Sequence, residues 1–81
     1  MPIESKYLTF IHIRNSPSNK TKIIHVFNKT NEIFLGVVSW FAAWRKYCFE
    51  PESEMVFDSN CLQDIKDFLD KENKQHKEER L

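Results

Sequence analysis

The sequence predicts an α+β fold, in which an antiparallel sheet of about five short strands (a meander) packs one face against a single C-terminal helix. Two observations support this prediction. Short runs rich in β-branched and aromatic residues alternate with polar turns over residues 7–57, and an apolar stripe at helical spacing follows them. A sheet with one helix on it is the smallest arrangement that buries both sets of apolar residues. With 81 residues, the chain has room for one modest core.

The first three strands are expected in the N-terminal half. Tyr7–Arg14 and Thr21–Asn28 are separated by a polar loop that contains Pro17, and they should pair as a hairpin. The third run, Ile33–Phe41, contains the only glycine of the chain, Gly36. A lone glycine inside a strand indicates a bulge, or the close approach of a ring from a neighbouring strand.

The other two strands are expected at Arg45–Glu50 and Met55–Phe57. A helix over Ser39–Phe49 is the alternative, because both tryptophans and Tyr47 follow an i, i+4, i+7 spacing. The β-branched residues before this segment, and Pro51 directly behind it, favour strands.

The first expected strand does not alternate strictly between apolar and polar residues. Leu8 and Phe10 would point to one face of the sheet. The other face would carry Tyr7, Thr9, Ile11 and Ile13. This pattern is typical of a strand that is covered on both faces for part of its length.

The helix is expected to begin at Asp58–Asn60, because all three residues are good N-caps, and Asn60 with Gln63 resembles a capping box. An apolar stripe follows at helical spacing, formed by Cys61, Leu62, Ile65, Phe68 and Leu69. From Lys71 to Arg80 there is no apolar residue. We therefore expect a single domain over residues 1–70, and a charged helical extension or frayed tail over residues 71–81.

The net charge of zero conceals an asymmetry. The chain has 12 basic and 12 acidic side chains, which argues against a generally basic nucleic-acid binder. Residues 1–49 nevertheless carry a net charge of +5, and residues 50–81 a net charge of −5. The protein is predicted to be electrically two-sided, or self-neutralising if the helix packs across a basic face of the sheet.

The sequence indicates a cytoplasmic protein with reduced thiols. No secretory signal is visible at the N-terminus, and two cysteines are too few for a disulfide scaffold. No apolar run approaches the roughly 18 residues of a membrane span, so no membrane association is expected.

We find no arrangement of residues typical of an enzyme. One glycine excludes a phosphate-binding loop, and the position of Cys61 in the apolar stripe assigns it to the core, although a helix N-terminus can lower the pKa of a thiol. The four histidines and cysteines that a zinc site would need, His12, His25, Cys48 and Cys61, lack the usual short-range ligand pairs. We expect no catalytic residues, no metal and no cofactor.

The candidate binding residues lie in and near the aromatic segment from Leu35 to Pro51. Arg45, Tyr47 and Phe49 would share one face of a strand. A guanidinium beside aromatic rings can bind a phosphate while the rings stack on a base, and it can also anchor a protein partner. The same rings are needed to fill a small core, so the sequence leaves open which of them are exposed. The candidates are Arg14, Trp44, Arg45, Lys46 and Tyr47.

The same segment, together with Cys61–Phe68, resembles a family of small uncharacterised proteins from bacterial and phage or prophage genomes. The pattern is L-G-x-[IV]-x-W-x-x-x-W-R-x-Y-x-F-x-P followed by C-L-x-D-I-x-x-F, and the resemblance covers residues 34–69. Phe41–Ala43 departs from the aromatic-proline step expected before the second tryptophan, which leaves the geometry of that turn open. The resemblance implies a phage-type origin and no established activity.

These observations predict a small non-enzymatic binding protein, of the phage or prophage accessory or inhibitor type, that occupies the surface of an unidentified host or phage protein. The alternative is nucleic-acid or nucleotide binding through a basic, aromatic face of the sheet. A third interpretation is a virion component, or a homo-oligomer formed by strand-edge pairing. The sequence does not determine the oligomeric state.

Overall fold

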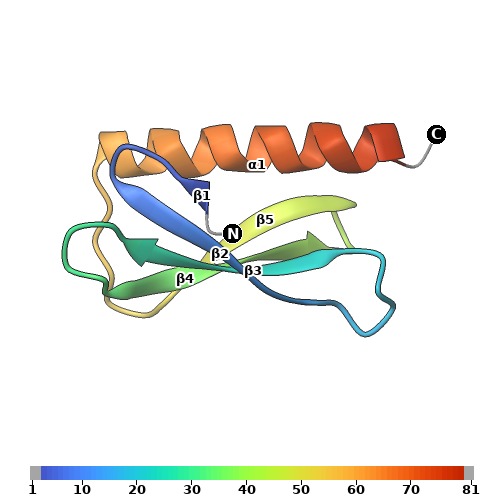
Figure 1. Cartoon of the computed structure of the whole chain (residues 1–81), viewed down its shortest axis with the longest axis horizontal. Coiled ribbons are helices and arrows are strands. Elements are labelled where there is room, and N and C mark those ends of the chain that lie inside the picture. Colours follow the sequence, from blue (N-terminus) through green and yellow to red (C-terminus); the bar gives the residue numbers. More distant parts are fainter. Residues whose placement is uncertain (1–2, 80–81) are drawn as a thin grey trace.

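The computed structural model describes residues 3–79, apart from the Glu79 side chain, as an antiparallel sheet crossed on one face by a long helix (Figure 1). The strands lie in the sheet in chain order, so the sheet is a meander and the predicted fold class is confirmed. The elements are β1 (Ile3–Glu4), β2 (Leu8–Asn15), β3 (Lys22–Asn28), β4 (Phe34–Phe41), β5 (Lys46–Pro51) and α1 (Ser59–Glu79).

Two strands differ from the prediction. Ile3–Glu4 forms β1 by pairing with Phe10 and Thr9, and a two-residue strand is too short to show a pattern in sequence. The predicted strand at Met55–Phe57 is wrong, because this segment is an irregular connection between β5 and α1. The ring of Phe57 packs edge-on against that of Phe49, with centroids 5.5 Å apart.

A tight turn joins β4 to β5, as the strand interpretation of residues 39–49 requires. Trp40 pairs with Tyr47 across the two strands, and Phe41 pairs with Lys46. Arg45 reverses the chain with a φ of 54°, and its N–H donates to the Phe41 carbonyl oxygen at 2.8 Å. The alternative helix over Ser39–Phe49 is therefore wrong.

Gly36 has both features expected of a lone glycine in a strand. The register between β3 and β4 shifts beside it, because Val26 pairs with Gly36 whereas Phe27 pairs with Phe34. The ring of Phe49 also lies against it. A Cβ at this position would be 2.8 Å from Phe49 Cζ and 2.4 Å from the Glu50 carbonyl oxygen.

Of the three N-cap candidates in the sequence, Asp58 begins the helix, two residues before the expected capping pair of Asn60 and Gln63. The Asp58 carboxylate accepts a hydrogen bond from the Cys61 N–H at 2.8 Å, and the Asp58 carbonyl accepts one from the Leu62 N–H at 3.0 Å. Asp58 is thus the N-cap. The predicted pair of Asn60 and Gln63 is wrong, since the Gln63 amide donates to Asp67 instead.

The core lies between the sheet and α1. The rings of Phe10 and Phe68 stack there with centroids 4.0 Å apart. Leu62, predicted to belong to the buried stripe, is exposed. The buried core residues are Leu8, Phe10, Ile24, Val26, Leu35, Val38, Tyr47, Ile65 and Phe68.

Replacing Gly36 by alanine should destabilise the protein by about 2–4 kcal/mol, because the added methyl group meets a backbone carbonyl that cannot move aside. Urea denaturation of Gly36→Ala measures this loss. Ser39→Ala, on the same strand, is the control and should cost less than about 1 kcal/mol. Equal stabilities of the two variants would contradict the close approach.

The Asp58 cap should make stability depend on pH. Hydrogen bonds from Cys61, the backbone N–H first, lower the pKa of the Asp58 carboxyl. The stabilisation is complete above the ordinary aspartate pKa of about 3.9, and it is lost as the pH falls through the lowered value. Thermal melts of Asp58→Ala should show a loss at neutral pH that disappears at low pH. Glu52→Ala, in the same β5–α1 connection, is the control, and its melting temperature should not differ from that of the parent protein in this pH-dependent way.

Candidate functional site

Four polar residues attach the second half of α1 to the sheet, beyond the apolar stripe. Glu72, only 3% exposed, accepts a hydrogen bond from the Lys22 ammonium at 2.9 Å. The Tyr47 N–H donates to the Asn73 Oδ1 at 2.7 Å, and the Asn73 amide donates back to the Tyr47 carbonyl at 3.4 Å. The Lys22 N–H donates to the Tyr47 hydroxyl oxygen at 3.0 Å. We call Lys22, Tyr47, Glu72 and Asn73 the polar clamp.

The polar clamp also protects one edge of the sheet. Because the N–H and C=O of Tyr47 bond to Asn73, they are not available to a strand from another molecule. Pro51, at the other end of β5, has no N–H to donate. The edge of β5 is therefore a poor site for the strand-edge oligomer considered from the sequence.

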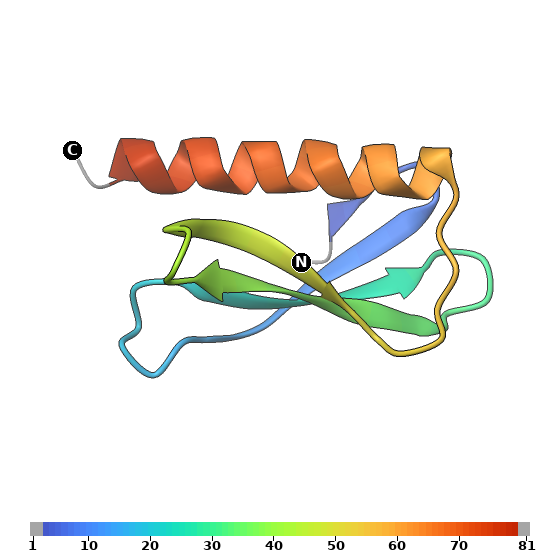
Figure 2. The same cartoon turned by 180° about the vertical axis from the view of Figure 1, so that it is seen from behind.

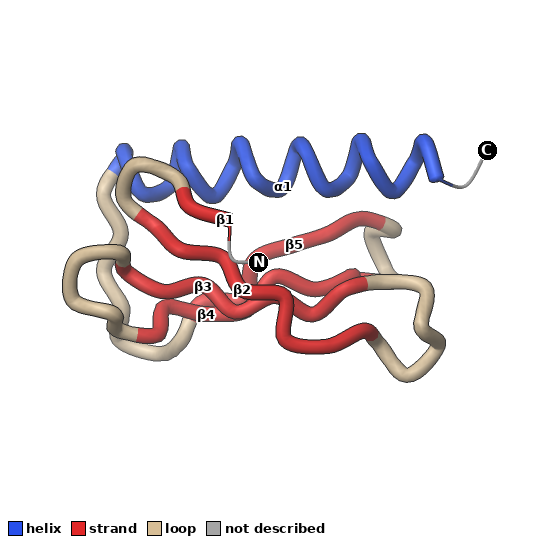
Figure 3. Tube along the Cα trace, in the orientation of Figure 1, coloured by secondary structure: helices blue, strands red, loops and turns tan. Residues whose placement is uncertain are grey.

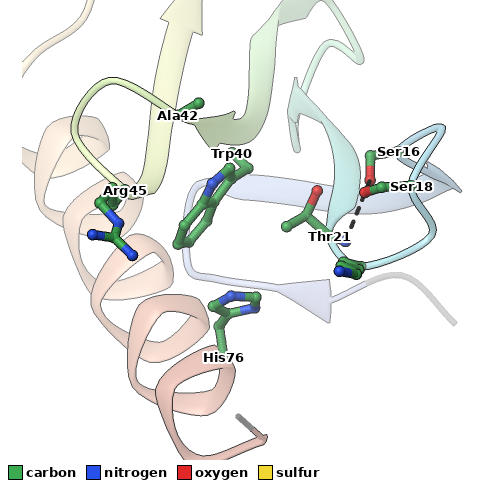
Figure 4. Close-up of a pocket in the computed structure, with 8 residues that line it drawn as sticks. Ser16, Ser18, Thr21, Trp40, Ala42, Arg45 and His76 are labelled. Carbon is green, nitrogen blue, oxygen red and sulfur yellow. Dashed lines mark hydrogen bonds between the residues drawn. The ribbon is translucent and has the colours of Figure 1, made fainter.

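One helical turn beyond Glu72, His76 forms a groove with the end of the sheet. Its ring lies against Trp40, with centroids 4.5 Å apart. The groove, of about 760 Å³, opens between the β2–β3 loop, the β4–β5 turn and α1, and Figure 4 shows the Trp40 ring near its centre. We call it the basic groove. It is lined by Ser16, Ser18, Lys20, Thr21, Trp40, Ala42, Arg45 and His76.

The basic groove combines three kinds of group suited to an anionic ligand that carries a ring. Lys20 and Arg45 supply positive charge, three residues of the β2–β3 loop supply hydroxyl groups, and Trp40 with His76 supplies flat surfaces. Among the side chains that the structure describes, no carboxylate lines it. Its volume lies in the range of about 300–1,000 Å³ typical of small-molecule sites.

The charges separate toward the two ends of the molecule. The β2–β3 loop, the β4–β5 turn and the end of α1 lie at the same end of the molecule (Figure 3), and they carry Lys20, Arg45 and Lys77, although Glu78 also lies there. The opposite end holds the β3–β4 and β5–α1 connections, with Glu32, Glu52, Glu54 and Asp58, although Lys6 and Lys29 also lie there. Across the helix–sheet interface the described residues form one ion pair, Lys22 with Glu72. The predicted electrical asymmetry is therefore a difference in charge between the two ends of the molecule, and not between its two faces.

The structure separates the five candidate residues. Arg45 lines the basic groove, whereas Trp44, 66% exposed, lines a separate hollow between β5 and α1, with its ring edge-on to Phe41 at 5.0 Å. Lys46 on β5 and Arg14 on β2 are exposed at the same end of the sheet, on strands that β3 and β4 separate. Tyr47 is 3% exposed, so its ring fills the core and offers no surface for stacking.

Arg45 does not share a strand face with Tyr47 and Phe49, as the sequence pattern predicts. It lies in the turn, with a positive φ, whereas the two rings face the helix. The groove residues that were not candidates come from the polar β2–β3 loop, from β4 and its turn (Trp40 and Ala42), and from the charged part of the helix. His76 has no apolar neighbours in sequence that would place it against the sheet.

The histidines and cysteines lie apart. His12 and His25 are on opposite faces of the sheet, since His12 pairs with Ile24 whereas His25 pairs with Ile11. Among the described residues, no three His, Cys, Asp or Glu side chains gather where they could hold a metal ion. Cys48 and Cys61 are free thiols, and burial and then the Asp58 carboxylate raise the pKa of Cys61, opposite to a helix N-terminal effect.

The fold and the groove define a small two-layer α+β protein with one basic, partly aromatic end. A curated protein of Acholeplasma phage L2, described as an uncharacterized 9.3 kDa protein, is 34% identical to this chain over 65 residues, which are 80% of this chain and 82% of the phage protein. The chain belongs to the family of that phage protein. No protein-family model matches the chain, and no solved structure matches it.

The described residues form no helix with the length and apolar character that crossing a membrane requires.

Replacing Asn73 by alanine should destabilise the protein by about 1–2 kcal/mol, because the half-enclosed N–H of Tyr47 loses its acceptor. Chemical denaturation measures the change. Gln75→Ala, two residues further on an exposed position of the same helix, is the matched control and should stay within about 0.5 kcal/mol of the parent protein. If both variants are equally stable, the polar clamp does not attach the helix.

Proposed function

We propose that the protein is a phage-type accessory protein that acts by non-covalent binding, and that its basic end binds single-stranded nucleic acid. The observation that supports this proposal is the composition of the basic groove, where the described side chains supply cations, hydroxyl groups and two rings to one cavity. Phosphate groups need the cations and the hydroxyl groups, and unpaired bases stack on rings.

The arrangement of these groups suits a strand better than a duplex. Trp40 and His76 lie inside the groove, where only a base that is unpaired and turned outward can reach them. Trp44 follows in the same β4–β5 turn as Arg45, and its exposed ring is available to a further base outside the groove. Arg14 and Lys46, on the same end, extend the positive surface beyond the cavity.

The net charge of zero does not oppose this function. The molecule is 37 Å long, and its acidic connections lie at the end remote from the groove. Charges separated by more than the Debye length, about 8 Å at physiological ionic strength, are largely screened from one another. A phosphate at Arg45 therefore experiences mainly the basic end.

A host or phage protein is the second candidate partner, in which case the chain acts as an inhibitor by occupying that partner's surface. Trp44 with Phe41 at its side supports this candidate, because an exposed tryptophan next to an arginine is the composition of binding hot spots. Such a partner would present an acidic surface beside an apolar pocket.

Fluorescence anisotropy with a labelled single strand of about 12 nucleotides tests the proposal. Lys20→Ala/Arg45→Ala should weaken binding about tenfold at low salt, and should reduce the slope of log K against log salt by about 1.4, since each phosphate contact on a single strand contributes about 0.7. The matched control is Lys6→Ala/Lys29→Ala, which removes the same charge at the opposite end.

Absence of binding by the parent protein at low salt would overturn the nucleic-acid proposal. So would equal losses in the two double variants, because they would indicate attraction to net charge alone. The protein candidate is tested separately by affinity capture from a host lysate. Trp44→Ala should lose a partner that the parent protein retains at moderate salt.

A further inference from the structure

The face of the sheet opposite α1 is apolar and is left open by the described residues (Figures 1 and 2). Its centre is a row across four strands, in which Ile11 pairs with His25, His25 with Val37, and Val37 with Glu50. Beside this row, the rings of Phe27 and Phe34 lie 5.5 Å apart. We call this surface the outer face. It carries Thr9, Ile11, Ile23, His25, Phe27, Phe34, Val37, Ser39, Cys48 and Glu50.

The strands of the outer face have sequences that are typical of strands covered on both faces of a sheet. Ile23–Phe27 and Phe34–Val38 are nearly continuous apolar runs, which are typical of strands buried on both faces. Ile11, Phe27 and Val37 are only half-buried, because α1 covers the other face alone. The two-sided covering that the first strand predicts is therefore not completed within the described chain.

We propose that a second copy of this chain covers the outer face, in an antiparallel dimer with two-fold symmetry. The charges on β5 support this occupant. Its successive outward residues are Lys46, Cys48 and Glu50, so opposite charges flank a central thiol. A two-fold axis near Cys48, perpendicular to the strands, places Lys46 of each copy over Glu50 of the other.

The charge difference between the ends favours the same orientation. In the antiparallel dimer, the basic end of each copy lies over the acidic end of its partner, so the two long-range fields attract. A parallel arrangement would bring one basic end onto the other. The net charge of zero also removes overall repulsion between copies.

The size of the outer face predicts a weak dimer. Four strands about 4.8 Å apart, over about six residues of 3.3 Å each, cover roughly 400 Å² as a flat area. Side chains that project from the sheet raise the accessible area, but a standard interface buries about 800 Å² on each partner. We therefore expect a monomer–dimer equilibrium that depends on concentration.

This dimer leaves the basic groove open. Trp40 and His76 belong to the side of the sheet that carries the helix, away from the outer face. The two-fold axis places the two grooves at opposite ends of the dimer. The inference does not rest on nucleic-acid binding, because it concerns a different surface.

Sedimentation of Val37→Lys and Val56→Lys from micromolar to millimolar concentration tests the outer face. Both variants exchange the same residue, but Val37 lies in the central row whereas Val56 is 91% exposed in the β5–α1 connection. We expect Val56→Lys to dimerise like the parent protein, and folded Val37→Lys to stay monomeric. A parent protein that remains monomeric at millimolar concentration would overturn the proposal.

Charge reversal on β5 tests the orientation and does not depend on whether Val37→Lys folds. Lys46→Glu alone and Glu50→Lys alone each place like charges together twice, so each variant should dimerise at least about tenfold more weakly. Mixing the two variants restores both opposite-charge contacts, so the mixture should dimerise like the parent protein. Unchanged dimerisation of the single variants, or no recovery in the mixture, would contradict the antiparallel dimer.

Discussion

The polar clamp is the contact on which the rest of the molecule depends. The apolar stripe of α1 ends at Leu69, so the burial of apolar side chains does not stabilise the packing of the following turns on the sheet. These turns are held on the sheet by the ion pair of Glu72 with Lys22 and by the hydrogen bonds of Asn73 with Tyr47. They extend the docked helix to His76, which then meets Trp40 and closes one side of the basic groove.

The position of the charges matters more in this protein than their sum. A composition with equal numbers of acidic and basic residues describes a neutral chain, but the fold brings two basic loops and the end of a helix together. Screening over the 37 Å length then allows each end to act on its own surroundings. The same separation supports both proposals, an anionic ligand at one end and a second copy laid antiparallel on the outer face.

Most of the fold could be predicted from the sequence, because most of its strands and its helix are long enough to show a periodic pattern of apolar residues. The failures were local. Ile3–Glu4 is a strand of two residues that pairs with β2, Met55–Phe57 is an irregular connection whose Phe57 ring packs on Phe49, and Asp58, not Asn60, caps the helix. Of the residues that line the basic groove, Arg45 was a candidate from the sequence, whereas Trp40, the loop residues and His76 were not; the candidate Tyr47 belongs to the core.

By itself, the sequence determined the order of the strands and the helix, the apolar character of both faces, and the close approach at Gly36, because these depend on residues near one another along the chain. Only the tertiary structure decided which apolar face the helix covers and where the charges gather. It also decided that Tyr47 is buried while Trp44 is exposed. Those outcomes depend on contacts between residues far apart in the chain, such as that of Lys22 with Glu72. The spacing of residues along the sequence does not predict such contacts.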